Sequence, residues 1–157
     1  MTTKDNLISD FSDPAFQEMF KRYFAELNVP VKNWDGLFEE MNTHDGGNLA
    51  YVRFCGGEPT GFIQFKPVTL ENWFFKERLG FIREFWVDKK FRKQGQGTTL
   101  LSLTERYFKD SGIHRIILTA DESEQPFYLN RGYRIVKTIE AKNQMTVLIK
   151  EWKEAAV

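Results

Sequence analysis

Apolar residues recur at three- and four-residue steps in two stretches near the start of the chain, Phe16 to Leu27 and Trp34 to Met41. Steps of this kind place the apolar side chains on one face of a helix. We therefore predict a first helix that starts near Asp13-Pro14 and is ended by Asn28-Val29-Pro30, followed by a second, shorter helix. The sequence His44-Asp-Gly-Gly-Asn48 then breaks the helical pattern.

Apolar runs bounded by glycine and other turn-forming residues predict strands over the rest of the chain. Two helical stretches interrupt them: one ends at Gly112, and the other has Ser123 as its expected N-cap and ends at Gly132. A turn at Gly56-Gly57-Glu58-Pro59 joins the first two strands. The predicted strands are Leu49–Cys55, Gly61–Lys66, Phe81–Val87, Ile113–Ala120, Tyr133–Ile139 and Met145–Glu151, and the predicted helices are Thr98–Ser111 and Ser123–Arg131.

This order, two helices and then strands with two further helices between them, predicts an α/β fold in which helices pack on a mixed sheet. The last two strands are expected to pair antiparallel. The chain has 157 residues and no internal repeat, low-complexity segment or Pro/Ser-rich linker. We therefore expect residues 1–157 to form a single domain.

Composition narrows the class of protein. Lys plus Arg and Asp plus Glu both number 22, so the net charge is zero and bulk attraction to nucleic acid or an anionic membrane is not expected. The single cysteine, Cys55, cannot form an internal disulfide, and with only two histidines there is no ligand set for a structural metal. The N-terminus lacks the apolar run of a signal peptide, and no stretch could span a membrane. A soluble cytoplasmic protein without metal is expected.

Chemistry is indicated by the segment Asp88-Lys-Lys-Phe-Arg-Lys-Gln-Gly-Gln-Gly97, which lies between a strand and a helix. A glycine-containing loop at a helix N-terminus exposes unpaired backbone N–H groups that suit a phosphate group. The alternative is a solvated loop whose glycines only turn the chain. No P-loop string occurs, and a dinucleotide fingerprint would need glycine at position 100, where the chain has leucine.

Three short stretches resemble the GNAT superfamily of N-acetyltransferases. Arg92-x-x-Gly95-x-Gly97 is similar to the Gln/Arg-x-x-Gly-x-Gly/Ala motif, and Phe85-Trp86-Val87-Asp88 is similar to the family's fourth strand. Gln125-Pro-Phe-Tyr-Leu-Asn-Arg-Gly-Tyr133 is similar to its Phe-Tyr-x-x-x-Gly-Phe/Tyr stretch. The resemblance is close over residues 81–136, and the order of elements extends it over most of the chain.

The resemblance implies a mixed, mostly antiparallel central sheet, splayed between its fourth and fifth strands and flanked by helices, with acetyl-CoA as co-substrate. The glycine loop would surround the pyrophosphate, and the opened fourth strand would pair with the pantetheine. The family often has asparagine after the fifth strand, where this chain has an aspartate. The implied cofactor-binding residues are Phe85, Trp86, Val87, Arg92, Lys93, Gln94, Gly95, Gln96, Gly97, Thr98 and Asp121.

Two residues are candidates for proton transfer. Tyr128 matches the tyrosine that, in many such enzymes, protonates the departing thiolate; the alternative is an aromatic residue that fills the interface between helix and sheet. Glu84 is the first candidate for the base that deprotonates the amine, with Asp121 and Glu122 behind it. By strict alternation Glu84 points to the face opposite Phe85 and Val87, which favours the alternative that it forms an ion pair with Arg83, Arg53 or a lysine; removal of the proton through water is the other alternative.

The resemblance implies direct transfer of an acetyl group to a primary amine of a small molecule or peptide. A CoA-binding module without catalysis is the alternative. Two segments are candidate walls of the acceptor site: Val29–Trp34, between the first two helices, and Leu70–Phe75, with three consecutive aromatic residues. The aromatic run could instead form a contact in a homodimer.

Overall fold

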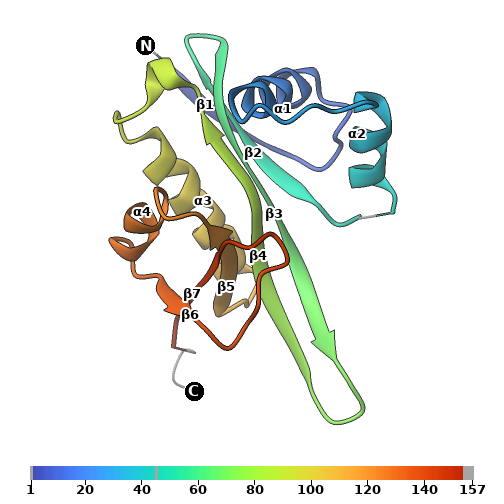
Figure 1. Cartoon of the computed structure of the whole chain (residues 1–157), viewed down its shortest axis with the longest axis vertical. Helices are drawn as coiled ribbons and strands as arrows, with labels where there is room; N and C mark the ends of the chain where they lie inside the picture. The colour runs from blue at the N-terminus through green and yellow to red at the C-terminus, as the bar shows by residue number, and fades with distance from the viewer. Residues whose placement is uncertain (1, 45, 154–157) are drawn as a thin grey trace. The chain divides into compact units, whose positions relative to one another are not determined.

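The computed structural model describes residues 2–44 and 46–153. Strands and helices follow one another from the N-terminus to the C-terminus as coloured in Figure 1. In chain order they are β1 (Thr3–Ile8), α1 (Pro14–Glu26), α2 (Trp34–Asn42), β2 (Leu49–Cys55), β3 (Glu58–Glu71), β4 (Lys76–Val87), the 3-10 helix η1 (Lys89–Phe91), α3 (Gln96–Asp110), β5 (Arg115–Ala120), α4 (Gln125–Leu129), β6 (Arg134–Val136) and β7 (Thr146–Glu151).

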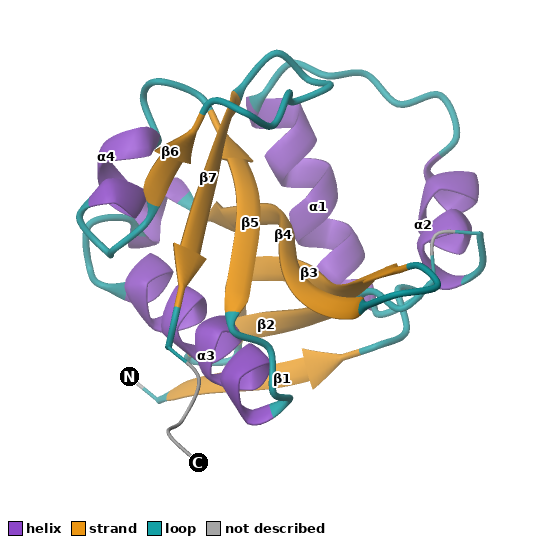
Figure 2. Ribbon diagram, turned by 90° about the horizontal axis from the view of Figure 1, so that it is seen from below, coloured by secondary structure: helices purple, strands orange, loops and turns teal. Residues whose placement is uncertain are grey.

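The strands form a seven-stranded mixed sheet in the order β1-β2-β3-β4-β5-β7-β6. Strand β7 pairs antiparallel with both β5 and β6, between which it lies (Figure 2). The pair β4–β5 is parallel, and its register covers only Gly80–Ile116 and Phe81–Ile117. Beyond that point β4 runs on to Val87 while β5 continues in its pairing with β7, so the sheet is splayed between its fourth and fifth strands. The predicted fold class is confirmed.

Two compact units can be distinguished by their internal contacts. Unit 1 comprises the described residues within Met1–Lys66 and Glu84–Thr104, and unit 2 those within Pro67–Arg83 and Glu105–Val157. Strand β4 and helix α3 each contribute residues to both units. The glycine loop belongs to unit 1, and Tyr128 and Asp121 belong to unit 2.

The core of unit 1 is aromatic, and helices α1 and α2 cover one face of its strands. The Phe16 ring lies 5.0 Å from that of Phe62 on β3, and Phe20 lies 5.7 Å from the same ring. Ring pairs at these separations add to the free energy gained by burying apolar area. The remaining buried members of this core are Phe11, Met19, Phe38, Met41, Ala50, Val52 and Trp86.

In unit 2, the second half of α3 packs on the short strands. A side chain at Gly80 would place its Cβ within 2.7 Å of the Phe108 ring, so β4 and α3 approach closely at this glycine. The Tyr133 hydroxyl donates to Glu105 Oε2 (2.8 Å), and Lys150 Nζ lies 3.1 Å from both oxygens of the same carboxylate. Helix α3 is thereby joined to β4 by close packing and to Tyr133 and Lys150 by a charge-assisted network.

Several predicted bounds are wrong, and one strand was missed. Strand β1 carries Lys4, Asp5 and Asn6 and has no apolar alternation; its pairing with β2 and the Arg53–Asp5 ion pair (2.9 Å) stabilise it. Strands β3 and β4 extend beyond the predicted runs. Helix α3 begins at Gln96 rather than Thr98, and α4 and β6 are shorter than predicted.

No helix among residues 2–44 and 46–153 has the length and apolar character needed to cross a membrane.

Candidate active site

The loop between β4 and α3 has a backbone that few sequences could adopt. Lys93 and Gly95 both have positive φ angles, 62° and 83°. The left-handed region costs little for glycine but is strained for lysine. The Gly95 carbonyl accepts the first helical hydrogen bond, from Thr99 N (3.0 Å), so α3 starts directly after this glycine. The next two amides, those of Gln96 and Gly97, therefore have no acceptor within the helix.

The start of α3 is fixed to β3 by a buried polar contact. Thr60 and Gln96 are both buried, and the Thr60 hydroxyl donates to Gln96 Oε1 (2.7 Å). The Thr60 carbonyl accepts from Asp88 N (2.8 Å), at the other end of the loop. One residue of β3 thus holds both ends of the predicted phosphate loop. The Gln96 side chain is committed to this contact, which leaves its backbone amide for a ligand.

Arg92 makes its contacts within the protein. Its Nη2 atom lies 2.7 Å from both carboxylate oxygens of Glu26 on α1, and its Nε donates to the Val87 carbonyl (2.7 Å). A second pair joins the same helix to the start of the loop: Arg22 Nη1 lies 2.7 Å from Asp88 Oδ2. Two ion pairs therefore connect α1 to the segment predicted to bind phosphate.

The lysines of the loop, together with Gln94, face solvent. The structure places Lys89, Lys90 and Lys93 as exposed residues around the backbone of the loop. Asp88 Oδ1 accepts from Lys90 N (3.0 Å) and so caps the short helix η1. Exposed amines beside free helix amides give the loop the electrostatics of an anion site.

Glu84 has a hydrogen-bond partner that the sequence analysis did not anticipate. The Tyr23 hydroxyl on α1 donates to Glu84 Oε2 at 2.6 Å, a length typical of a charge-assisted bond. The Tyr23 ring contacts Phe20, Phe24 and Phe62, which fix its position. Both residues belong to unit 1. The end of β4 that carries Glu84 and the neighbouring Phe85, Trp86 and Val87 therefore faces a residue of the first helix.

Tyr128 is buried on α4, with 5% of its surface exposed. Its ring makes edge contacts with Phe127 and Tyr133, at 5.1 and 5.5 Å. Burial, and to a smaller extent the charge of Glu124, raises the pKa of this phenol. Among the described residues none forms a hydrogen bond with its hydroxyl. The structure thus keeps Tyr128 protonated at neutral pH, with its proton available to another molecule.

Asp121 caps the turn that leads into α4. Its Oδ1 accepts from the Ser123 hydroxyl (2.7 Å) and from Glu124 N (3.0 Å). The hydrogen bond from Ser123 is the main reason why the pKa of Asp121 lies below its usual range. The predicted role of Ser123 as N-cap is wrong, because its hydroxyl bonds Asp121 and the cap residue, Glu124, makes no side-chain cap bond. A lowered pKa also makes Asp121 a poor proton acceptor at neutral pH.

The predicted acceptor walls lie on exposed turns. Trp73 and Phe74 are 100% and 94% exposed at the tip of the β3–β4 hairpin. Asn72 Oδ1 accepts from the amides of Phe74 and Phe75, which fixes the turn that presents them. In the connection between α1 and α2, Val29 is exposed.

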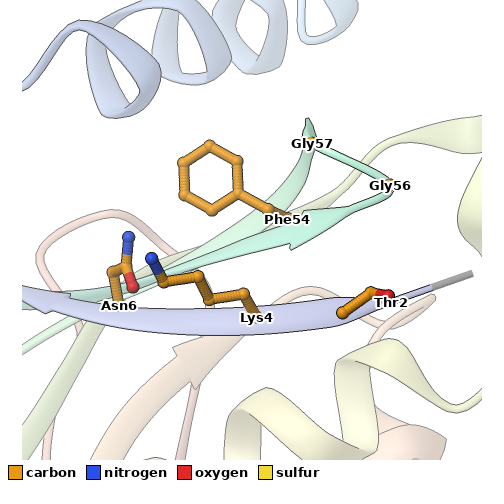
Figure 3. Close-up of a pocket in the computed structure, with 6 residues that line it drawn as sticks. All are labelled: Thr2, Lys4, Asn6, Phe54, Gly56 and Gly57. Atoms are coloured by element: carbon orange, nitrogen blue, oxygen red, sulfur yellow. The ribbon is translucent and has the colours of Figure 1, made fainter.

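A separate hollow of about 480 Å³ lies on β1 and the β2–β3 turn (Figure 3). The side chains of Lys4 and Asn6 point to the same side of β1 as Phe54 of β2, and Gly56 and Gly57 close the hollow at the turn. None of the predicted site residues lines it. The part of the chain that the structure describes contains no group of three His, Cys, Asp or Glu residues arranged to hold a metal ion.

Sequence reasoning missed three residues of α1 that contact the site: Arg22, Tyr23 and Glu26. Each lies more than 60 positions before its partner in the sequence. The one available signal was the charge order, because Arg22 and Glu26 are four residues apart, as are Asp88 and Arg92, with opposite signs.

Comparison with known proteins identifies the class. The acetyltransferase (GNAT) family profile matches residues 7–133. The chain therefore belongs to this family, and the predicted recognition is confirmed. No curated protein sequence matches the chain significantly.

Several solved structures have a similar fold at low sequence identity. A predicted acetyltransferase from Clostridium acetobutylicum, solved with acetyl-CoA, has a TM-score of 0.74 and 15% identity over 89% of this chain and 95% of its own. Arabidopsis thaliana NAA60, in complex with a bisubstrate analogue, has a TM-score of 0.69 and 17% identity over 97% of this chain and 100% of its own. An aminoglycoside acetyltransferase from an uncultured soil metagenomic sample, in complex with sisomicin, has a TM-score of 0.66 and 18% identity over 89% of this chain and 91% of its own.

Proposed function

We propose that residues 1–157 act as one cytoplasmic N-acetyltransferase domain, which transfers an acetyl group from acetyl-CoA to a primary amine. Family membership supports the acetyl donor. The observation that carries the proposal for this chain is the loop from Arg92 to Thr98. Its two residues with positive φ turn the backbone directly into the first turn of α3, whose leading amides have no acceptor in the helix. That arrangement suits a pyrophosphate.

The donor site uses backbone groups and charge. The amides of Gln96 and Gly97 donate to the pyrophosphate, and Lys89, Lys90 and Lys93 provide positive charge around it. The splay of the sheet after Phe81 gives β4 an edge along which pantetheine can lie as a β-strand would. Asp121 is a weaker candidate for the cofactor arm, since its carboxylate already caps the turn before α4.

The transfer itself is a direct attack. The neutral amine attacks the thioester carbonyl carbon to form a tetrahedral intermediate, and backbone N–H groups near Phe85 or Val87 stabilise its oxyanion. The carbon–sulfur bond then breaks, and the thiolate of CoA takes the proton of the Tyr128 hydroxyl. The phenolate regains a proton from the nitrogen of the new amide, directly or through water, so that the enzyme returns to its starting state. The Tyr128 hydroxyl suits this role because it forms no hydrogen bond with another described residue, so its proton can pass to a bound thiolate.

The amine must lose a proton before it attacks. Glu84 is the proposed base, directly or through water, and Tyr23 holds its carboxylate by a hydrogen bond. Similar folds include an aminoglycoside acetyltransferase and NAA60 with a bisubstrate analogue, so a small-molecule amine or a peptide amine is proposed as the acceptor.

The test has two stages. Thermal stability with acetyl-CoA, NAD and ATP first identifies the ligand class, and stabilisation by acetyl-CoA alone is expected. Release of free CoA is then measured against a library of amines. Binding of acetyl-CoA without turnover on any amine, while Tyr128→Phe leaves binding unchanged, would favour a CoA-binding module without catalysis.

A further inference from the structure

Two ion pairs of opposite polarity connect helix α1 with the segment that surrounds the phosphate loop. On α1, Arg22 and Glu26 are one turn apart and therefore project from the same face. Arg22 pairs with Asp88, and Glu26 pairs with Arg92, each at 2.7 Å. If the order of the two charges were reversed on the helix or on the loop, like charges would meet. The two pairs therefore favour one alignment of the helix along the loop segment.

Two nitrogens of the Arg92 guanidinium, Nε and Nη2, already form hydrogen bonds within the protein. Nη2 contacts both oxygens of Glu26, and Nε donates to the Val87 carbonyl at the end of β4. One nitrogen thus contacts both oxygens, and because both partners are ionised the contact is charge-assisted and stronger than a neutral hydrogen bond. To bind phosphate through these same atoms, Arg92 would have to give up Glu26 and Val87.

The loop that Arg92 holds is strained. Lys93, the next residue, has a φ of 62°, and Gly95 has a φ of 83°. A non-glycine residue persists in this conformation only where its surroundings fix it. Thr60 fixes the two ends of the loop, through Asp88 N and Gln96 Oε1. Between those ends Gln94 bonds the Lys90 carbonyl within the loop, and Arg92 joins the loop to α1.

We infer that Glu26 is a positioning residue for the donor site: it holds Arg92, and through Arg92 the strained loop, in the shape that binds the CoA phosphates. This inference rests on the proposed function. It assigns the motif arginine a role in shaping the loop rather than direct contact with phosphate, and it makes donor affinity depend on a helix outside the motif.

The test is the acetyl-CoA dissociation constant of Glu26→Gln, measured by calorimetry. If Glu26 positions the loop, this variant binds about fivefold more weakly, the upper range for a partly exposed pair. Arg92→Ala weakens binding similarly, and the double variant is no weaker than either single variant. Glu18→Gln, the same charge change at an exposed position of α1, is the matched control and leaves binding unchanged.

A model in which Arg92 binds phosphate directly predicts a different change in acetyl-CoA affinity for Glu26→Gln. If Arg92 contacts phosphate directly, loss of Glu26 removes a competing carboxylate, so Glu26→Gln binds acetyl-CoA as tightly as the parent or more tightly, while Arg92→Ala alone weakens binding. That pattern would overturn the inference.

A second measurement separates this inference from the proposed function. Limited trypsin digestion reports the order of the loop at Lys89, Lys90 and Lys93 without any ligand. Glu26→Gln is expected to be cut there faster than Glu18→Gln and the parent. Equal cutting rates would contradict the positioning role. A parent protein that fails to bind acetyl-CoA would instead contradict the proposed function, and the digestion would still test the contact.

Discussion

The phosphate loop of unit 1 and the Tyr128 helix of unit 2 are held by different kinds of contact. Polar and charged side chains from α1 and β3 hold the loop: Glu26 binds Arg92, and Thr60 binds Gln96. Tyr128 is held by apolar burial and by the edges of the Phe127 and Tyr133 rings, and no described side chain bonds its hydroxyl.

The difference follows from what each part is proposed to do. A loop that binds a pyrophosphate must keep its amides directed at one point, and directional bonds do this well. A proton donor must have its hydroxyl free to meet the thiolate, and apolar packing around the ring holds Tyr128 without a hydrogen bond to that hydroxyl. Perturbing the loop should therefore change donor binding, and perturbing Tyr128 should change the chemical step.

The largest effect is expected for Tyr128→Phe, which removes the hydroxyl and retains the ring. A positioned proton donor contributes about 10²- to 10⁴-fold to a rate, so kcat should fall by that factor while acetyl-CoA affinity changes little. Steady-state kinetics with a good amine acceptor, beside a binding titration, measure both quantities. In the parent, the raised pKa should also keep kcat from declining near pH 10, where an ordinary phenol loses its proton.

Tyr133→Phe is the matched control for this prediction. Tyr133 is also buried in unit 2, but its hydroxyl donates to Glu105. Its loss should lower the free energy of unfolding by about 1 kcal/mol and leave kcat near that of the parent. A Tyr128→Phe enzyme with kcat within about twofold of the parent would show that water or another group protonates the thiolate.

The second effect concerns donor binding. Gly97→Val places a branched side chain in the first turn of α3, beside the amides that are proposed to bind pyrophosphate. We expect acetyl-CoA affinity to fall by at least about tenfold while the fold persists, because valine is no worse than glycine inside a helix. Calorimetry measures the affinity, and circular dichroism checks the fold.

Thr99→Val places valine two residues later, where a branched side chain of similar size already stands, and serves as the control. Its hydroxyl bonds only the Gly95 carbonyl, so affinity should change little. Unchanged affinity in a folded Gly97→Val protein would remove this turn from the donor site. Another part of the molecule would then have to bind the pyrophosphate, and the loop would no longer represent the donor site in the comparison with the Tyr128 helix.

A smaller effect is expected for Tyr23→Phe. This change deletes the 2.6 Å hydrogen bond to Glu84 and leaves the ring in its aromatic cluster. The hydrogen bond favours the ionised carboxylate, so its loss makes Glu84 easier to protonate. The acidic limb of kcat/KM should therefore move to higher pH.

The control is Tyr51→Phe, a tyrosine of β2 whose ring stacks on Phe65. Its pH profile should match that of the parent. If Tyr23→Phe changes the amplitude of kcat/KM but leaves the limb in place, Glu84 is not the titrating base and a water-relayed path would replace it.

The smallest effect is expected at the hairpin tip. If Trp73 forms a wall of the acceptor site, Trp73→Ala should raise the acceptor KM by a few-fold (~3-fold) and leave acetyl-CoA affinity unchanged. Kinetics are to be compared with sedimentation of the same samples. A change in oligomeric state alone would assign the aromatic run to a homodimer contact instead.

The sequence predicted those elements whose signal is local. Asp13 accepts from Phe16 N and caps α1, as its place before Pro14 suggests, and strand β2 has the predicted bounds Leu49–Cys55. The glycine loop and the helix that follows it were also predicted, because positive φ angles and helix starts are recorded in neighbouring residues. These features depend on a few consecutive side chains.

The tertiary structure alone decided which side chains meet. Strand β1 carries no apolar alternation and exists because β2 provides its hydrogen-bond partners. The pairs Tyr23–Glu84 and Glu26–Arg92 join residues 61 and 66 positions apart. Ion pairs and hydrogen bonds act over a few ångströms of space, and the folded chain, not its local pattern, sets those distances.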